Sequence, residues 1–338
     1  MRSRTSAKSP RRRRVAAIDI GTVSSRLSLA FVTDEAVVEA RRLTVITDLG
    51  AGVDATRQFS SDAIERVRNA CSRFVCEART FGARSSCTTL TSAARDAGNA
   101  DILLEKLADL GLEPQVIPGE VEARLTFYGV ARDFDDERIV VVDSGGGSTE
   151  FATGAFDASR RDVRLEHVRS LDIGCRRVTD RFLQGDPPSA DQIASARSWA
   201  RAGFSRYWPT LAERPHKLVA VGGTVTTLVA LTHGLKDYDA SFVHLRQLAL
   251  SEVESAIERM RDLPVREIAE LAGIQPKRAP VILAGALIIA ELMRAGGYDS
   301  LTVSENSLLV GLAATIGEEL AASPSAIGWT PRLAVLED

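Results

Sequence analysis

The chain has 338 residues, of which 45% are hydrophobic and 26% are charged, and its formal net charge is -3. This composition is typical of a globular protein with about two domains. We find no apolar run of the roughly 20 residues that a membrane helix needs and no apolar signal region after the N-terminus, so we expect no membrane partner.

The N-terminal segment, residues 1–14, differs from the rest of the chain in its charge. It carries seven basic residues and no acidic one, which leaves 35 basic and 45 acidic residues in the remainder. We predict a disordered, solvated basic arm. Such an arm could also attract polyphosphate or nucleic acid by its charge, but we expect no specific nucleic acid partner.

The first half of the chain predicts a strand meander followed by alternating helices and strands. Strands are expected at 15–20, 26–32 and 36–46, where apolar residues run together or alternate with polar ones. Ser60 or Ser61 can cap a helix whose apolar stripe runs from Ala63 to Val75. The helix is followed by a strand at about 86–90 and by helices at about 100–110 and 120–131.

The second half predicts more helices, after an acidic turn at 133–137 that we take as the hinge between two domains. The β-branched run 139–142 predicts a buried central strand. Further strands are expected at 150–153, 217–221 and 301–303, and helices at 174–182, 190–208, 224–232, 250–260, 279–295 and about 306–320. We therefore predict domains at 15–132 and 133–338, with the helix at about 306–321 able to pack on the first domain.

An internal repeat is the most informative feature of the sequence. Residues 15–25 resemble residues 139–149, because each segment has a strand that ends on an aspartate, followed by a turn of glycine and hydroxyl residues. Two such halves facing each other would form one cleft between domains, where ligands tend to bind. The equivalent residues are Asp19 and Asp143, Gly21 and Gly145, and Ser24 and Ser148.

The turns predict phosphate binding, because their backbone N–H groups can surround an anion and their hydroxyls add donors. A third turn, at 222–224, joins a strand to a helix N-terminus, which is a further anion site. The sequence is not a Walker A loop, since no Gly-Lys-Ser/Thr follows. The expected phosphate-binding residues are Gly21, Thr22, Ser24, Ser25, Gly145, Gly146, Gly147, Ser148, Thr149, Gly222, Gly223 and Thr224.

Several charged residues are candidates for catalysis. Asp19 and Asp143, brought together by the repeat, would need a cation between them, and Mg²⁺ is the usual one. Glu122 lies in the first turn of a helix, where it could either complement the helix dipole or orient a water as a general base. Arg95 could bind a phosphate or lie in solvent. The cysteines and histidines show no metal-ligand spacing, so we expect buried free thiols in a reducing cytoplasm.

The chain resembles the exopolyphosphatase and guanosine pentaphosphate phosphohydrolase (Ppx/GppA) family from about Val15 to Leu320. The resemblance depends on five motifs in a fixed order: Ala17–Thr22, Thr91–Asn99, Gly119–Leu125, Asp143–Glu150 and Val221–Thr224. It implies two ribonuclease-H-like domains of the actin-like ATPase superfamily, facing an interdomain cleft. It also implies release of the terminal phosphate of inorganic polyphosphate, or of the 5′ phosphate of pppGpp.

The resemblance further implies roles for individual residues. Glu122 matches the proposed catalytic base, and Arg95 matches a contact to substrate phosphate. Asp143 and Glu150 match acidic residues tied to Mg²⁺ (or Mn²⁺) and water, and we include Asp19 in the expected metal site. The resemblance makes a homodimer the expected assembly.

Three positions depart from the family pattern: Val23 in the first turn, Val121 before Glu122, and Asp48 where many members have arginine. These departures favour short polyphosphate chains as substrate. They also motivate an alternative, a polyphosphate- or (p)ppGpp-binding regulator with weakened turnover. A further alternative is an actin-like ATPase or sugar kinase, for which the same turns would bind ATP.

Overall fold

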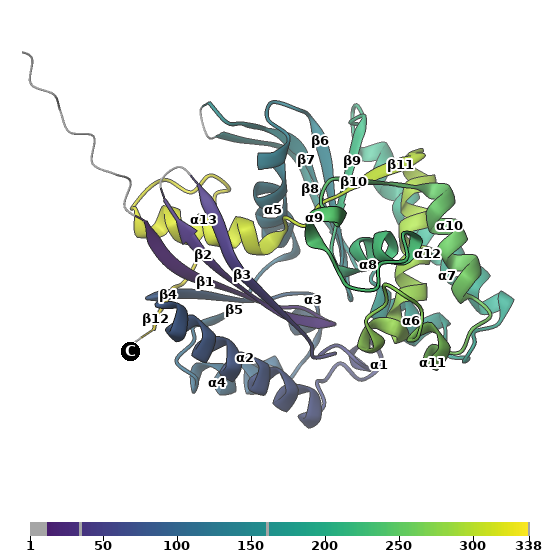
Figure 1. Ribbon diagram of the computed structural model, residues 1–338, viewed down its shortest axis with the longest axis horizontal. Coiled ribbons are helices and arrows are strands. Elements are labelled where there is room, and N and C mark those ends of the chain that lie inside the picture. The colour runs from purple at the N-terminus through teal and green to yellow at the C-terminus, as the bar shows by residue number, and fades with distance from the viewer. Residues whose placement is uncertain (1–11, 34–35, 160–161, 337–338) are drawn as a thin grey trace, which may run out of the picture.

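The computed structural model describes residues 12–33, 36–159 and 162–336, which form two β-sheets with helices packed around them (Figure 1). In the first sheet, three antiparallel strands form a meander, and two further strands continue it in parallel to the first strand. A short C-terminal strand pairs antiparallel with β4. The strands are β1 (Arg13–Ile20), β2 (Ser24–Val32), β3 (Val37–Ile46), β4 (Ser85–Leu90), β5 (Pro114–Val116) and β12 (Ala334–Val335).

The second sheet repeats this plan. Its meander is again antiparallel, and the next two strands run parallel to the first one, with a short strand added at the edge. The strand order β8-β7-β6-β9-β11 thus matches the order β3-β2-β1-β4-β5 of the first sheet. The strands are β6 (Ile139–Ser144), β7 (Thr149–Asp157), β8 (Asp162–Leu171), β9 (Lys217–Val221), β10 (Arg246–Ala249) and β11 (Ser300–Val303).

The helices of the first half cover the outer face of the first sheet and lead into the second. They are α1 (Val53–Thr56), α2 (Ser61–Phe81), α3 (Ser92–Asp96), α4 (Ala100–Ala108), α5 (Gly119–Val130) and the 3-10 turn η1 (Ala131–Asp133). Ser60 caps α2 by accepting a hydrogen bond from the Ala63 N–H, as the sequence predicts. The apolar stripe of α2 then packs on β1 and β2 in the core of the first half.

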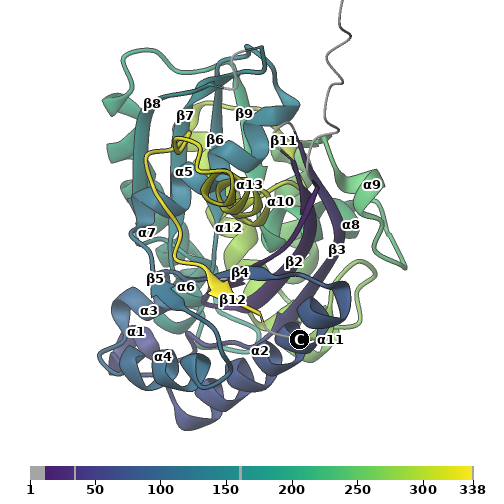
Figure 2. The same ribbon diagram turned by 90° about the vertical axis from the view of Figure 1, so that its left-hand side faces the viewer.

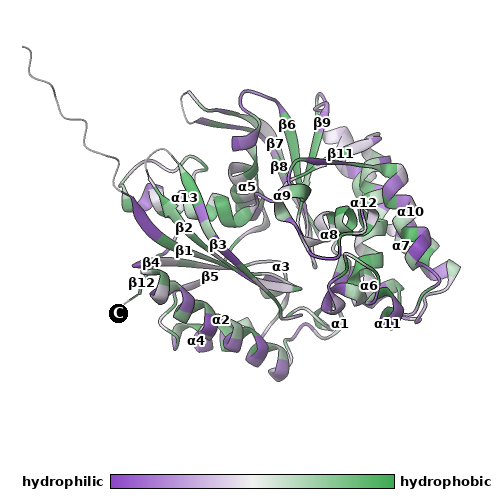
Figure 3. Cartoon of the chain, in the orientation of Figure 1, coloured by the Kyte–Doolittle hydropathy of each residue, from purple (hydrophilic) through white to green (hydrophobic). Residues whose placement is uncertain are grey.

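The helices of the second half all follow the strand meander of the second sheet in sequence. They are α6 (Cys175–Phe182), α7 (Ala190–Tyr207), α8 (Gly223–Thr232), α9 (Ala240–Val243), α10 (Leu250–Met260), α11 (Val265–Ile268), α12 (Ala279–Gly296) and α13 (Leu308–Leu320), with 3-10 turns η2 (Trp208–Thr210) and η3 (Pro276–Arg278). The segment Pro276–Gly296 is long and apolar enough to cross a membrane, contrary to the sequence expectation. Of its 18-residue apolar window, 83% is buried within the fold, and α12 packs against α6, α7 and α10 (Figure 3).

Two helices lie between the sheets and join the two halves (Figure 2). Helix α13 packs on β1 and β2 of the first sheet, although it follows the second sheet in sequence. Helix α5, which the sequence places in the first domain, packs on β6, β7 and β8. The two helices also touch each other closely, so one apolar core spans both halves.

Three sequence expectations need correction. The basic arm was expected to end at Arg14, but β1 begins at Arg13, and Arg12 lies over the Phe31 ring at 3.5 Å; residues 1–11 of that arm lie outside the described residues. The sequence also missed β8, because this edge strand has charged residues along its exposed face. The short strands β5, β10 and β12 were missed because three or four residues give too little periodicity to detect.

The contact between α5 and α13 predicts a large effect of one added methyl group. A Cβ at Gly311 would lie 1.9 Å from the Leu125 backbone oxygen, so Gly311→Ala should lower the free energy of unfolding by about 1–3 kcal/mol. Gly317→Ala, in the same helix, is the control, because its nearest neighbour is 3.3 Å away. Chemical denaturation of both variants checks this; equal stability of the two would contradict the close packing.

Candidate active site

The two turns of the internal repeat have the same backbone geometry. The N–H of Gly21 donates to the oxygen of Ser24 at 2.9 Å, and that of Gly145 donates to the oxygen of Ser148 at 3.0 Å. In the strand pairs that carry the turns, Asp19 lies opposite Arg26, and Asp143 lies opposite Glu150. The repeat seen in the sequence is therefore confirmed as a structural repeat.

Each turn is supported from behind by a neighbouring segment. The oxygen of Val23 accepts hydrogen bonds from the N–H groups of Thr47 and Asp48. In the second turn, the oxygens of Gly145 and Gly146 accept from the N-terminal end of α6. No described residue accepts a hydrogen bond from the N–H groups of Gly146, Gly147 or Ser148. Because they have no acceptor within the described protein, these N–H groups are free to bind an anion.

The third turn completes the arrangement. Gly222 has a φ of 97°, which a residue with a side chain rarely adopts, and a Cβ there would lie 2.9 Å from Asp143 Oδ1. Helix α8 begins directly after it, so its first N–H groups face the same region with the positive end of the helix dipole. The third turn therefore lies directly against Asp143, with a helix N-terminus beside the carboxylate.

The three turns enclose one cavity of about 60 Å³. Its walls include most of the residues that the sequence predicted: Asp19, Gly21, Thr22, Ser24, Glu122, Asp143, Gly145, Gly146, Gly147, Ser148, Gly222, Gly223 and Thr224. Asp19, Glu122 and Asp143 are all buried. Segments far apart in the sequence are thus brought together at a small polar cavity between the two sheets.

Two expected phosphate-binding hydroxyls do not face this cavity. Ser25 is buried and bonds to the Thr47 hydroxyl at 3.0 Å, because successive residues of β2 point to opposite faces and Ser24 faces the cavity. The Thr149 hydroxyl donates to the Ile173 oxygen at 2.6 Å. Both hydroxyls fix the backbone around the turns instead.

Asp19 and Asp143 lie in a strongly charged environment. Arg26 donates from Nε to Asp19 Oδ2 at 3.0 Å, while Asp19 Oδ1 is buried and has no described hydrogen-bond partner. Burial raises the pKa of Asp143, Arg26 opposes this rise, and Asp19 adds to it. Within the described residues no three Asp, Glu, His or Cys side chains converge as a complete metal cage. A cation that takes its other ligands from substrate and water still fits beside Asp143 and the unpartnered Oδ1 of Asp19.

Glu122 is held by Arg95 at the edge of the cavity. Arg95 Nη1 donates to Glu122 Oε2 at 2.8 Å and to the Ile117 oxygen at 2.9 Å. Burial raises the pKa of Glu122 to about 7, although Arg95 lowers it, and Asp19 and Asp143 raise it further. A carboxylate with a pKa near neutrality is suited to accept a proton from water.

Glu150 and the second nitrogen of Arg95 lie just behind Glu122. Arg95 Nη2 is 3.4 Å from Ser148 Oγ and 3.7 Å from Glu150 Oε1. Burial, followed by the proximity of Glu122 and Asp143, raises the pKa of Glu150 well above its usual value. Ser170 donates to Glu150 Oε1 at 2.7 Å. Arg95 and Glu150 thus contact the residues that line the cavity without lining it themselves.

Arg278 lies in no motif of the sequence and was missed by the sequence analysis; it lines the cavity from the end of η3. A Cβ at Gly223 would lie 2.1 Å from Arg278 Nη1, so the guanidinium lies over the start of α8. The Arg278 backbone N–H donates to the Gln275 oxygen, but no hydrogen bond or ion pair joins its guanidinium to another residue in the described part of the chain. Burial lowers its pKa, and the positive charge of Arg26 lowers it further. A cation without a counter-ion beside a helix N-terminus is suited to bind an anion.

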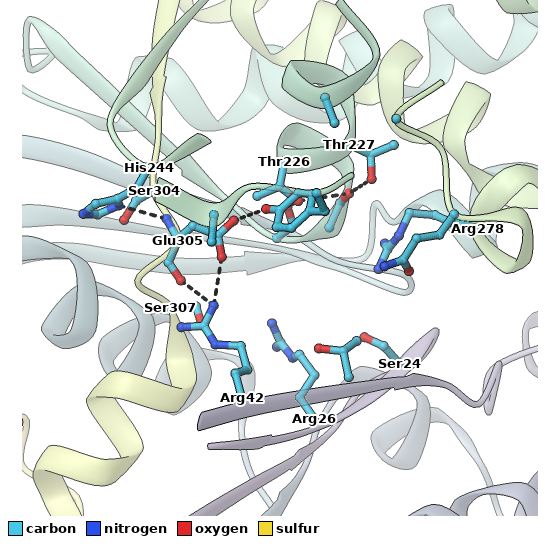
Figure 4. Close-up of a pocket in the computed structure, with 18 of the residues that line it drawn as sticks. Ser24, Arg26, Arg42, Thr226, Thr227, His244, Arg278, Ser304, Glu305 and Ser307 are labelled. Atoms are coloured by element: carbon cyan, nitrogen blue, oxygen red, sulfur yellow. Dashed lines mark hydrogen bonds and ion pairs between the residues drawn. The ribbon is translucent and has the colours of Figure 1, made fainter. Parts of the chain in front are cut away.

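A larger pocket of about 760 Å³ continues from the small cavity (Figure 4). The two share Ser24, Arg26, Gly222, Gly223 and Arg278. Figure 4 shows Ser24, Arg26 and Arg42 entering from the first sheet, and Thr226, Thr227 and Arg278 from the second half. Arg42 is paired with Glu305 at 3.0 Å and with Glu39 at 2.9 Å, so its charge is already balanced.

The three departures from the family motifs have different surroundings. Val23 lines the cavity, where its methyl group lies against Gly146 and packs into the core of the second half. Val121 is partly buried against the shared core. Asp48 does not line the cavity; its carboxylate is bound by Arg176 through two hydrogen bonds of 2.7 Å. Its negative charge is therefore neutralised behind the first turn.

Comparisons with known proteins agree with this geometry. A model of the Ppx/GppA phosphatase family matches residues 32–315. Exopolyphosphatase 2 of Mycobacterium tuberculosis is 37% identical over 324 residues, covering 90% of this chain and 98% of that protein. The guanosine-5'-triphosphate,3'-diphosphate pyrophosphatase of Photobacterium profundum is 30% identical, covering 88% of this chain and 58% of that one.

Solved structures show the same fold. The crystal structure of an exopolyphosphatase-like protein matches with a TM-score of 0.85 at 31% identity, covering 92% of this chain and 99% of that one. Together with the repeated sheet topology, this agrees with a fold of two similar sheets that enclose the cavity between them. The chain belongs to the Ppx/GppA phosphatase family, whose members are phosphoanhydride hydrolases.

Proposed function

We propose that the protein releases the terminal phosphate of short inorganic polyphosphate chains, with Mg²⁺ or Mn²⁺ as cofactor. The observation that carries this proposal is that the buried Glu122, held by Arg95, faces the same cavity as three turns of phosphate-binding geometry. The name of the Mycobacterium tuberculosis relative, an exopolyphosphatase, supports the choice of substrate. A cytoplasmic location remains the expectation from the cysteines, and a homodimer remains the expectation from the family resemblance.

Each group has a defined role in this proposal. The N–H groups of Gly146, Gly147 and Ser148 and the start of α8 bind the terminal phosphate, whose developing charge they stabilise. Glu122 accepts the proton of the attacking water, since its pKa of about 7 leaves it largely ionised at slightly alkaline pH. Arg95 orients Glu122 and keeps it next to the second turn.

A divalent cation would be held by Asp19 and Asp143, where it would neutralise phosphate charge when bound. The buried, unpartnered Asp19 oxygen and the raised pKa of Asp143 support this position. Glu150 accepts a hydrogen bond from Ser170. It therefore fits a supporting role behind Asp19 and Asp143 better than direct contact with the cation.

The distribution of cations supports short chains. Beyond the small cavity, Arg42 is balanced by Glu39 and Glu305. Of the arginines and lysines that line the larger pocket, Arg278 and the exposed Lys236 are the two without an ion pair to another described residue. A long polyanion would need many such cations along its path, whereas a few phosphates need only one or two.

Glu122→Gln should lower kcat for phosphate release from tripolyphosphate about 100- to 10,000-fold, because the amide cannot accept the proton. In the wild type, kcat/KM should rise with pH through about 7, the pKa of Glu122, and level off at slightly alkaline pH, where Glu122 is largely ionised. A phosphate-release assay between pH 5 and 9 measures both. Glu120→Gln, an exposed change in the same helix, is the matched control. Full activity of Glu122→Gln would remove Glu122 from the role of base.

Arg278→Ala should weaken tripolyphosphate binding about 10- to 100-fold, because a charge-assisted hydrogen bond contributes about 1.5–3 kcal/mol. Calorimetric titration in the presence of Mg²⁺ gives the dissociation constant. The exposed neighbour Lys277→Ala should bind as tightly as the wild type. Unchanged affinity of Arg278→Ala would show that the substrate does not reach this guanidinium.

The larger pocket favours pppGpp as a second candidate substrate. Its volume of about 760 Å³ is enough for a nucleoside, and it adjoins the phosphate cavity directly. It offers hydroxyl groups from Thr226, Ser241 and Ser304 together with the apolar side chains of Leu235 and Ile274. The pyrophosphatase relative from Photobacterium profundum acts, by its name, on such a nucleotide.

Ala240→Trp should separate the two substrates, because Ala240 is exposed and lines only the larger pocket. We expect kcat/KM for pppGpp to fall about 10-fold or more, while the value for tripolyphosphate stays within twofold. ATP in the same assay tests the actin-like ATPase alternative. Tight binding of either substrate without any phosphate release would support the regulator alternative instead.

A further inference from the structure

An array of ion pairs connects the two halves behind the phosphate-binding turns. The acidic members, Asp48, Asp54 and Asp96, belong to the first half, and the basic members, Arg176, Arg177 and Arg181, all lie on α6 of the second half. We call these six residues the interdomain clasp. The pairs are Asp48 with Arg176, Asp54 with Arg177 and Arg181, and Asp96 with Arg177.

The Asp48–Arg176 pair connects the supports of the first two turns. Asp48 donates its backbone N–H to the Val23 oxygen of the first turn at 2.9 Å. Arg176 donates its backbone N–H to the Gly146 oxygen of the second turn at 2.8 Å. Their side chains bind each other with two hydrogen bonds of 2.7 Å. One ion pair therefore links two residues that each support a phosphate-binding turn.

Arg177 makes a second connection, to the helix that carries Arg95. Its side chain is only 6% exposed and donates from Nε to the Gly147 oxygen at 2.9 Å. The same guanidinium pairs with Asp96, the residue after Arg95 in α3. Arg177 thus holds the second turn with one nitrogen and the segment of Arg95 with another.

We propose that the interdomain clasp is a positioning device that aligns the two phosphate-binding turns and Arg95 across the cleft. Its residues lie behind the turns and do not line the small cavity, so they act through the groups that touch substrate. The clasp also gives Asp48 a role, because its carboxylate forms an ion pair with Arg176 across the cleft. The effect of the clasp on the rate of phosphate release rests on the proposed function, whereas its effect on the alignment of the two turns does not.

The Asp48–Arg176 pair is tested with neutral substitutions of similar shape. Asp48→Asn and Arg176→Gln should each lower kcat for tripolyphosphate about 10-fold, because small misplacements of reacting groups cost such factors. The double variant should lose no more than either single variant, since both remove the same interaction. KM should change less than threefold. Single variants with kcat within twofold of wild type, or losses that multiply in the double variant, would overturn the proposal.

The control is an ion pair of the same length that lies within one half. Lys106 and Glu65 are 2.7 Å apart on α4 and α2, away from the turns. Lys106→Gln and Glu65→Gln should leave kcat unchanged. Arg177→Lys adds a second test, because lysine keeps the charge but cannot reach Gly147, Asp54 and Asp96 together. We expect a loss of kcat larger than that of Arg176→Gln; if this variant does not fold, the Asp48–Arg176 cycle decides alone.

Hydrogen–deuterium exchange separates the clasp from the proposed function. If the wild type releases no phosphate from tripolyphosphate or pppGpp, the proposed function fails, and the clasp is judged by exchange alone. Peptides that cover 21–24 and 144–148 should exchange faster in Asp48→Asn and Arg176→Gln than in the wild type and the Lys106→Gln control. Unchanged exchange in both peptides would overturn the clasp, whatever the activity.

Discussion

Four carboxylates are buried at the junction of the two halves, and the rest of the site depends on how their charge is balanced. Asp19, Asp143, Glu122 and Glu150 approach one another closely enough that burial and mutual repulsion raise the pKa of the last three. Arg26 and Arg95 are the cations that hold them. Since a buried like-charged cluster is costly, the site is suited to bind a metal ion and to keep one carboxylate near neutrality as a base.

The two halves of the repeat have diverged at the position that faces each aspartate. In the first half Arg26 lies opposite Asp19, and in the second half Glu150 lies opposite Asp143. The first aspartate therefore has one oxygen occupied by a cation, whereas the second has another carboxylate beside it. The same backbone geometry thus supports different electrostatics in the two turns, and the second turn, with its free N–H groups, is the better anion site.

Contacts on both sides of the cavity join the halves into one unit. On one side α5 and α13 pack between the sheets, each against the sheet of the other half in sequence. On the other side the interdomain clasp links the two turns through charged groups. The apolar contact buries a continuous core, whereas the ion pairs have partly exposed members, which makes each of them a weaker contribution to stability.

The sequence by itself determined the repeat, the three turns and most of the cavity residues, because local motifs specify how a strand ends and how a turn exposes its N–H groups. It also identified Glu122 and Arg95, but only through the resemblance to a family; spacing alone left their roles open. Tertiary structure decided which hydroxyls face the cavity, since Ser25 and Thr149 are turned away by strand alternation and by a local hydrogen bond. It also decided the place of Arg278 and the partner of Asp48. The contacts of Arg278 with Gly223 and of Asp48 with Arg176 join residues more than 50 positions apart in the chain. No local pattern predicts such contacts, because the packing of the whole fold brings these residues together.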